Sequence, residues 1–393
     1  MRGYWRYGDK MLINKKWIAV TTRTCSGKSV ACVIIFNLRA SLIVILSLIY
    51  FPMQIHGKSI CAGVDCSVFS QNIILGLNAI DPLLPGFYSN SFFHAMSESA
   101  VLNNINSSMP SNRNLAQPEI GFGYSMTKTE LENRNPLIKY TELNQLPKDG
   151  GAISPALHYG NSVSNIFKIK SSTLSKLNLN IHFFPYGFNE IQIPFANIKN
   201  MNVNGKVFNF GLSARYFPEV PRWNLFGMNL YLDGISLGSG LFYTSQDARF
   251  DSYDRKTTQL KIPGESRRWA GMNEMNYASS IYTGNIDARA GLSYSRFFLY
   301  TGLGYAMNSA YSSINVQRIA AISASKYSND FASRPTAVIL NIDEKYIKQF
   351  NTWFFIYGLE IQIGYIKIQA EVLNNSHSLS GNIGIKYLYY SDF

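Results

Sequence analysis

Apolar and polar residues alternate with a period of two along much of the chain after residue 119. In the first such stretch, Ile120, Phe122 and Tyr124 alternate with Gly121 and Gly123. Successive side chains of a strand point to opposite faces, so each stretch predicts a strand with one apolar face. About ten strands are predicted in this way, over residues 119–128, 151–160, 176–187, 206–217, 226–246, 277–294, 296–313, 352–363, 365–373 and 380–392.

Charged residues stand inside several of these strands, among them Arg215, Arg289, Glu360 and Lys367. A charge in the middle of a strand needs water or a partner. A soluble sandwich supplies water on its outside, and a membrane barrel supplies it in the lumen. The charges alone therefore leave both architectures open.

The lengths of the connections favour the barrel. Long polar connections alternate with shorter ones, and an even number of strands with long loops at one end is the pattern of outer-membrane barrels. The long connections are 129–150, 188–205, 247–276 and 314–351, and the shorter ones are 161–175, 218–225, a turn near Ser295-Arg296 and a turn at Gly364. We predict a mainly β protein, an antiparallel transmembrane up-and-down β-barrel over residues 119–393. Residues 335–343 are a candidate for a further strand.

A barrel of this size is close to those whose interiors side chains largely fill, so a wide solute channel is not expected. The last strand alternates apolar and polar residues and ends on aromatic ones. Tyr387, Tyr389 and the final Phe393 resemble the signal by which barrel-assembly machinery recognises outer-membrane proteins. The alternative is an ordinary edge strand that is last in the chain.

Residues 67–109 predict helices ahead of the barrel. Val68, Ile73, Leu77 and Ile80 share one helical face, and a second helix begins near Ser89 or Asn90 and ends before Pro110. This segment precedes the first strand, so we expect it to begin on the periplasmic side, where the chain ends. Whether it plugs the lumen or sits below it stays open.

The N-terminal residues predict export. Of the formal net charge of +12, residues 1–57 carry eight basic residues and one acidic residue, which leaves 28 basic and 23 acidic residues, or +5, for the remainder. An apolar run, Ala40 to Met53, follows the basic region, and a cut after Gly57 would make Lys58 the first mature residue. Two alternatives remain: the apolar run is kept as a membrane anchor instead of being cleaved, or translation starts at Met11. Nucleic-acid binding is not predicted for the mature chain.

Cysteine usage agrees with export. Cys61 and Cys66 remain after the predicted cut, and two close cysteines in an exported chain most simply form a disulfide. Lipidation of Cys61 is the alternative, although Lys58-Ser59-Ile60 places a charge and a bulky residue where small or apolar residues are expected. The mature chain is thus divided into residues 58–118, with the helices and the cysteine pair, and the barrel.

No spacing signature for catalysis or metal binding stands out. Gly27-Lys28-Ser29 resembles the end of a phosphate-binding loop, but Thr22 replaces the first glycine and the segment lies in the leader. His94, His158, His182 and His377 have no metal-ligand spacing, so no cofactor and no metal are predicted. We predict a protein that is not an enzyme, with a hydrolase at the barrel rim as a rival reading.

The most charged stretch is the predicted loop 247–276. Arginine and tryptophan are favoured anchors at protein interfaces, although a solvated loop of mixed charge explains the stretch as well. The candidate ligand-binding residues are Arg249, Arg255, Lys256, Lys261, Arg267, Arg268 and Trp269.

Three segments carry a resemblance to a known family. Ser99 to Met109 reads SAVLNNINSSM, Leu146 to Ala156 reads LPKDGGAISPA, and Cys61 to Cys66 reads CAGVDC. With the alternating C-terminal half, they resemble the leptospiral surface adhesin family of outer-membrane proteins and lipoproteins. The resemblance implies a surface-exposed protein that binds host matrix proteins such as laminin and fibronectin, and plasminogen. It carries over no individual binding residue.

We therefore expect an adhesin in the outer membrane, whose long outer loops bind host proteins. Its other expected partners are the outer-membrane lipid and the barrel-assembly machinery. A small pore lined by polar strand residues and a structural outer-membrane protein without a dedicated ligand are the alternatives.

Overall fold

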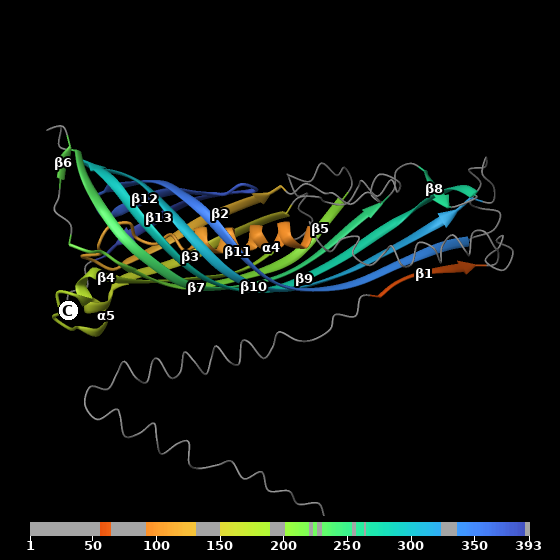
Figure 1. Cartoon of the computed structure of the whole chain (residues 1–393), viewed down its shortest axis with the longest axis horizontal. Helices are drawn as coiled ribbons and strands as arrows, with labels where there is room; N and C mark the ends of the chain where they lie inside the picture. The colour runs from red at the N-terminus through yellow and green to blue at the C-terminus, as the bar shows by residue number, and fades with distance from the viewer. Residues whose placement is uncertain are drawn as a thin grey trace, which may run out of the picture. The chain divides into compact units, whose positions relative to one another are not determined.

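Ten of the described strands close into an antiparallel ring (Figure 1). Each pairs with the next ring strand along the chain, and the last closes onto the first from Ser378 opposite Thr129 to Leu388 opposite Glu119. Closure satisfies the backbone groups that a bilayer cannot, and the predicted ten-stranded up-and-down barrel is confirmed. The ring consists of β2 (Glu119–Thr129), β3 (Gly150–Ser162), β4 (Leu177–Phe188), β5 (Met201–Tyr216), β7 (Leu230–Tyr253), β9 (Glu265–Tyr294), β10 (Phe297–Ile322), β11 (Thr336–Ile363), β12 (Ile366–Asn374) and β13 (Ser378–Leu388).

Three short strands are attached to this ring: β1 (His56–Gly63) pairs with β11, β6 (Trp223–Leu225) with β7, and β8 (Thr258–Ile262) with β9. The computed structural model describes residues 56–63, 92–130, 150–188, 201–219, 223–225, 230–253, 257–262, 265–323 and 336–389. Most of the predicted leader and the predicted helix over 67–80 lie outside these residues.

The barrel has two unlike ends. The turn end carries the tight turns at Ser295-Arg296 and Gly364-Tyr365, together with α5 (Val163–Phe167) and η4 (Leu174–Lys176). Ser295 and Gly364 have φ angles of 52° and 60°, as primed hairpin turns require of their first central residue. The loop end carries the connections 130–149, 189–200, 254–264, 323–335 and 375–377. The last ring strand finishes at the turn end, as expected, but it ends at Leu388 rather than running on toward Phe393.

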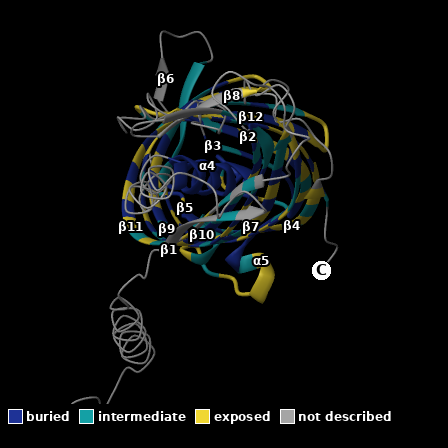
Figure 2. Cartoon of the chain, turned by 90° about the vertical axis from the view of Figure 1, so that its right-hand side faces the viewer, coloured by how far each residue is buried: buried dark blue, intermediate teal, exposed yellow. Residues whose placement is uncertain are grey.

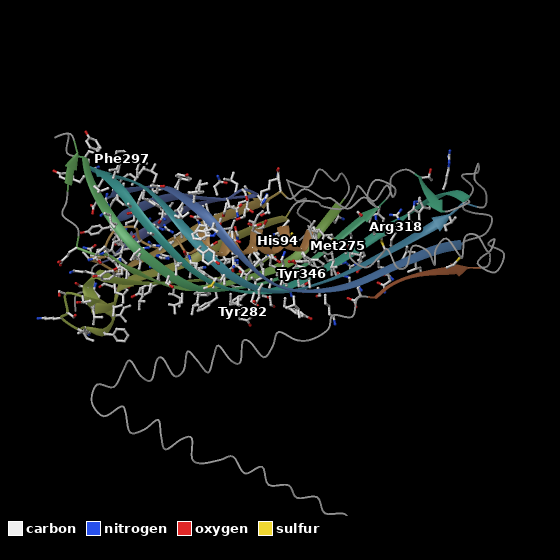
Figure 3. All side chains as sticks on the ribbon, in the orientation of Figure 1. His94, Met275, Tyr282, Phe297, Arg318 and Tyr346 are labelled. Atoms are coloured by element: carbon white, nitrogen blue, oxygen red, sulfur yellow. The ribbon has the colours of Figure 1, made fainter. Side chains whose placement is uncertain are left out.

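An apolar belt surrounds the outside of the ring near the turn end. On β13, Ile383 and Ile385 are exposed, while Asn382 and Lys386 on either side of this pair point inward and are buried. Tyr282 and Phe297 lie on the same outer surface (Figure 3). β2 and β13 each have 11 residues, which matches the 9–11 residues that a tilted strand needs to cross a bilayer. An apolar exterior around a polar interior is the arrangement of a transmembrane barrel.

Four strands are far longer than a crossing requires. β7, β9, β10 and β11 have 24, 30, 26 and 28 residues, so they continue beyond the belt at the loop end. The prediction of loops over 247–276 and 314–351 is therefore wrong for most of those residues. Residues 335–343 do not form a separate strand either, because 336–343 are the beginning of β11.

The two faces of these long strands exchange polarity where the belt ends. In β7, Leu241 points outward below this boundary, whereas Asp247 and Arg249 occupy the outward positions above it. The inward positions change in the opposite sense, from Thr244 and Gln246 to buried Ala248 and Phe250. An outward polar face fits water and an outward apolar face fits lipid, so the exchange marks the membrane boundary.

β10 repeats this exchange. Its outward side chains change from Leu303 and Met307 to Asn315 and Gln317, and its inward ones change from Asn308 and Ser312 to Ile314 and Val316. We call the part above the boundary the extension; it comprises residues 201–206 of β5, 247–253 of β7, 265–276 of β9, 313–322 of β10 and 336–352 of β11, with β1 and β8. Met275 and Arg318 mark it in Figure 3.

A helix, α4 (Phe92–Ser107), lies inside the ring (Figure 2). Every residue of α4 except His94 is buried, and the helix contacts strands on all sides. The second predicted helix is thus confirmed, and its position in the lumen resolves the open alternative. No helix within the described residues is both long and apolar enough to cross a membrane.

The polarity exchange predicts that the same substitution has different effects on the two sides of the boundary. Ile383→Lys places an ammonium at the middle of the belt and should lower the free energy of unfolding in lipid vesicles by about 2–4 kcal/mol. Gln317→Lys, outward on the extension, should change it by less than about 0.5 kcal/mol. Urea unfolding followed by tryptophan fluorescence measures both. Equal effects of the two substitutions would contradict the assigned boundary.

Candidate functional site: the filled lumen and the extension

Helix α4 begins at the loop end. Phe93 stacks on Tyr346 with 5.4 Å between ring centroids, and Phe92 meets Tyr277 edge-on at 5.9 Å. His94 lies edge-on to Phe350 at 5.0 Å. These partners belong to the upper parts of β9 and β11, where the inward face has become apolar and aromatic. The expectation that this segment starts on the periplasmic side, where the chain ends, is therefore wrong, because its first described helical residues lie at the opposite end.

Small polar residues join the middle of α4 to the polar wall of the lumen. Ser99 donates to Thr129 at 2.7 Å, and Asn103 accepts from Ser125 at 2.9 Å. On another side, the amide nitrogen of Asn104 donates to Thr244 at 2.7 Å. Such pairs satisfy buried polar groups that would otherwise lose their bonds to water.

Close backbone approach and apolar contacts complete the fit of the helix. A Cβ at Gly150 would lie 2.1 Å from the carbonyl oxygen of Ala95, so glycine is what lets β3 approach the helix. The remaining side of the helix packs against apolar residues of β7, β9, β10, β11 and β12. This cluster joins Ala100, Val101, Leu102 and Ile105 of α4 to Phe242, Ile281, Phe298, Tyr300, Ala306, Ala310, Phe350, Phe354, Ile356 and Leu373.

Below the helix, a first charged network crosses the lumen around Glu119. Its carboxylate is 3.1 Å from the ammonium of Lys367 and 3.2 Å from that of Lys386. It also lies 3.1 Å from the Nε2 of His158, while Lys367 is 3.4 Å from Glu360. The two carboxylates balance the two ammonium groups, as buried charges require.

A second network lies beside it around Arg289. The guanidinium of Arg289 is 2.5 Å from Glu371 and 2.9 Å from Asp287, and Arg215 is 2.5 Å from Asp287. Tyr300 donates to Glu371 at 2.7 Å. Two carboxylates again face two guanidinium groups, and all four charged side chains are buried.

Both networks bind the segment that follows α4, residues 109–112. Lys386 donates to the carbonyl oxygen of Met109 at 2.5 Å, and Lys367 donates to Ser111 at 3.4 Å. Arg289 donates to the side-chain oxygen of Asn112 at 2.9 Å. Arg113 then reaches the turn end, where it donates to the carbonyl oxygen of Phe297 at 3.4 Å. Residues 92–113 therefore occupy the lumen from the loop end to the turn end.

These contacts decide what the predicted pore-lining residues do. Arg215, Arg289, Glu360 and Lys367 all take part in the two networks and hold one another and the lumen chain. His158 and His182 lie in the lumen, where the Nε2 of His158 is 3.1 Å from Glu119 and that of His182 is 2.7 Å from Asn104. His377 is exposed in the turn between β12 and β13, and its backbone N–H donates to Asn375. His158 and His182 stand opposite each other on β3 and β4, whereas His377 lies in the loop-end turn, so the three histidines do not assemble into one site.

The candidate ligand-binding residues are spread over three strands. Arg249 on β7 is half-exposed and lies 3.1 Å from both Asp251 and Glu274; its hydrogen bond with Asp251 raises its pKa above the usual value. Arg268 on β9 is partly buried, and its backbone N–H donates to Ser323.

Trp269 corrects the prediction of an exposed aromatic anchor. It points inward, is only 6% exposed, and has the guanidinium of Arg318 at 4.2 Å from its ring. The remaining candidates are not placed in detail: Lys261 is on β8 and Arg267 on β9, without described side chains, and Arg255 and Lys256 lie outside the described residues.

The other predicted residues are placed as follows. Tyr387 is exposed on the belt, the backbone N–H of Tyr389 donates to Pro118, and Phe393 lies outside the described residues. Cys61 on β1 is disulfide-bonded, and its predicted partner Cys66 lies outside the described residues. The pairing of these two cysteines and the role of the aromatic residues in assembly stay predictions.

Sequence reasoning missed Glu119, Asp287, Lys386 and Glu371 as functional residues, although each stands on the polar face of its predicted strand. Their common signal is a charge at an inward position near the turn end. Aligning the predicted strands by their turns would have placed these charges at similar heights, but not in particular pairs.

The family model described as Lsa36-like matches residues 54–389. No curated protein matches the chain.

Several solved structures are similar to the chain at low identity. The toluene transporter TbuX of Ralstonia pickettii is 9% identical, with 75% of this chain and 93% of that chain covered and a TM-score of 0.23. The translocator domain of the autotransporter NalP from Neisseria meningitidis is 8% identical, with 77% and 99% covered and a TM-score of 0.33. A FadL homologue of Pseudomonas aeruginosa is 7% identical, with 75% and 98% covered and a TM-score of 0.23. TM-scores this low support no statement about transport or export by this chain.

The Glu119 network predicts a large effect from one missing charge. Glu119→Gln leaves two buried ammonium groups without their shared partner and should lower the free energy of unfolding by about 3–5 kcal/mol. Glu130→Gln, in an exposed pair with Lys128, is the matched control and should have almost no effect. Urea unfolding in detergent compares the two. A Glu119→Gln protein as stable as the unchanged one would contradict the assigned network.

Proposed function

The chain belongs to the Lsa36-like family, named after a leptospiral surface protein, and we propose that it is an outer-membrane surface adhesin rather than an open pore. The apolar belt lies in the bilayer, the turn end faces the periplasm, and the loop end with its extension faces outward. This orientation follows the rule that outer-membrane barrels have short periplasmic turns and longer outer segments.

The observation that carries the proposal is the contrast between the lumen and the extension. The lumen is occupied by α4 and the chain after it, and its charged residues bind one another. The extension, by contrast, continues about ten residues beyond the belt, or roughly 30 Å at about 3.3 Å per strand residue. A filled barrel with a tall, water-facing wall is suited to presenting a surface to other macromolecules.

The outward face of the extension carries the chemistry of a protein interface. Arg249 on β7 and Lys345 on β11 are exposed, and Ile347 stands two residues further along β11 as an exposed apolar residue. Mixed charges with scattered apolar side chains provide attraction at long range and contact area at short range. The proposed partners are host matrix or plasma proteins of the laminin, fibronectin and plasminogen kind. No catalytic role is part of this proposal.

The proposal predicts that charge reversal on the extension weakens binding. Arg249→Glu and Lys345→Glu should each reduce the affinity for immobilised fibronectin, laminin or plasminogen about two- to fivefold, because exposed charges contribute modestly and mainly to association. Lys170→Glu, exposed at the turn end, is the matched control and should bind normally. Surface plasmon resonance at two salt concentrations measures the effect, and binding should fall as the salt concentration rises. Equal binding by all three variants would contradict a role for the extension.

The filled lumen also predicts a result that separates an adhesin from a pore. The unchanged barrel should show no steady conductance in planar bilayers. Removal of Phe92–Ser107 should create a conducting channel, because a helix with its side chains is about 10 Å across. A heat-modifiable band in gel electrophoresis checks that the shortened protein still folds. Steady single-channel conductance of the unchanged barrel would favour the pore alternative.

A further inference from the structure

The direction in which the chain runs through the lumen determines at which end of the barrel the mature N-terminal segment lies. Phe92 and Phe93 lie at the loop end, against Tyr277 and Tyr346. Arg113 lies at the turn end, beside the first residue of β10. The chain therefore enters the ring at the loop end and leaves it at the turn end before β2 begins.

The residues before the helix provide a second, independent marker. β1 pairs antiparallel with the beginning of β11, from His56 opposite Asp343 to Gly63 opposite Thr336. These β11 residues are at least ten positions above Trp353, the first outward belt residue of that strand. At about 3.3 Å per residue, β1 lies roughly 30 Å or more from the belt, measured along β11, and is therefore within the extension.

We infer that the barrel carries its own N-terminal segment across the outer membrane, and that β1 is displayed outside the cell. This rests on the proposed orientation, in which the loop end faces outward. The predicted signal peptide delivers the N-terminus to the periplasm, which in this orientation is on the other side of the membrane from β1. The segment must therefore cross the membrane, after which α4 stays behind and fills the lumen.

The closed ring fixes the route of this crossing. The described ring strands are paired all round, and residues 92–113 run through the middle of them. Either the ring closes around the threaded chain or the chain passes through a ring that has already closed. In both cases β1 and the beginning of α4 end at the loop end, and in neither case does the crossing pass through lipid.

The position of β1 also distinguishes between the two predicted roles of Cys61, which are a disulfide and a lipid anchor. Lipidation needs a free thiol and an acyl chain that reaches the bilayer. The sulfur of Cys61 is already in a disulfide, and its strand lies far above the belt. Cys61 therefore belongs to a disulfide-bonded strand displayed at the tip of the extension, and it does not attach the chain to the membrane through a lipid.

The inference is tested with a ten-residue epitope inserted at one of three places in the full chain. One insertion follows Lys58, one follows Ser376 in the loop-end turn between β12 and β13, and one follows Ser171 at the turn end. Antibody labelling is compared on intact and permeabilised cells, and heat-modifiable mobility checks folding. We expect the first two epitopes to be labelled equally on intact cells and the third only after permeabilisation.

The outcomes separate this inference from the proposed function. Labelling after Ser376 but not after Lys58 on intact cells would overturn the inference and leave surface display standing. Failure of both loop-end epitopes, or labelling after Ser171 on intact cells, would overturn both. A second measurement avoids insertions: a membrane-impermeant amine reagent is applied to intact cells that make the unchanged protein. Mass spectrometry should find the label on Lys58 and not on Lys170, and the reverse pattern would overturn the inference.

Discussion

The rest of the structure depends on one constraint: polar groups removed from water must find partners inside the protein. In the belt, ring closure satisfies the backbone, because no strand keeps an unpaired edge there. In the lumen, side chains of the ring strands and the helix pair with one another, as Ser99 does with Thr129. The Glu119 and Arg289 networks meet this requirement for charges, and they also fix the path of the chain after α4. The interior is thus a polar core, and its contents determine which face of the molecule is free to bind.

The polarity exchange along the long strands follows from the same solvent argument. Below the boundary, lipid surrounds the barrel and favours an apolar exterior around a polar core. Above it, water surrounds the wall, so apolar residues such as Ile314 and Phe250 turn inward. One continuous sheet therefore serves two solvents. This change lets a small barrel carry a tall surface without widening its lumen, which is consistent with a protein that binds partners outside the membrane.

The sequence predicted the ten strands because each crossing keeps one face apolar over most of its length, as Ile120 to Met126 does. The prediction of strands failed above the boundary, where the apolar positions move to the other face and the alternation is interrupted, as between Leu241 and Ala248. The position of α4 was not predictable, since a helix buried on all sides has no single apolar stripe. The position of β1 depends on its pairing with β11, between residues 56–63 and 336–343, and no local pattern encodes it.

A paired-cysteine experiment in native membranes tests the central claim that α4 fills the lumen. Ser99 and Thr129 are joined by a 2.7 Å hydrogen bond between helix and wall, so Ser99→Cys with Thr129→Cys should form a disulfide on mild oxidation. Ser99→Cys with Ser164→Cys, at the turn end, is the control and should stay reduced. Mass spectrometry of tryptic peptides identifies the linked pair. A helix that forms no link to Thr129→Cys in folded barrels would lie outside the lumen and would contradict the account.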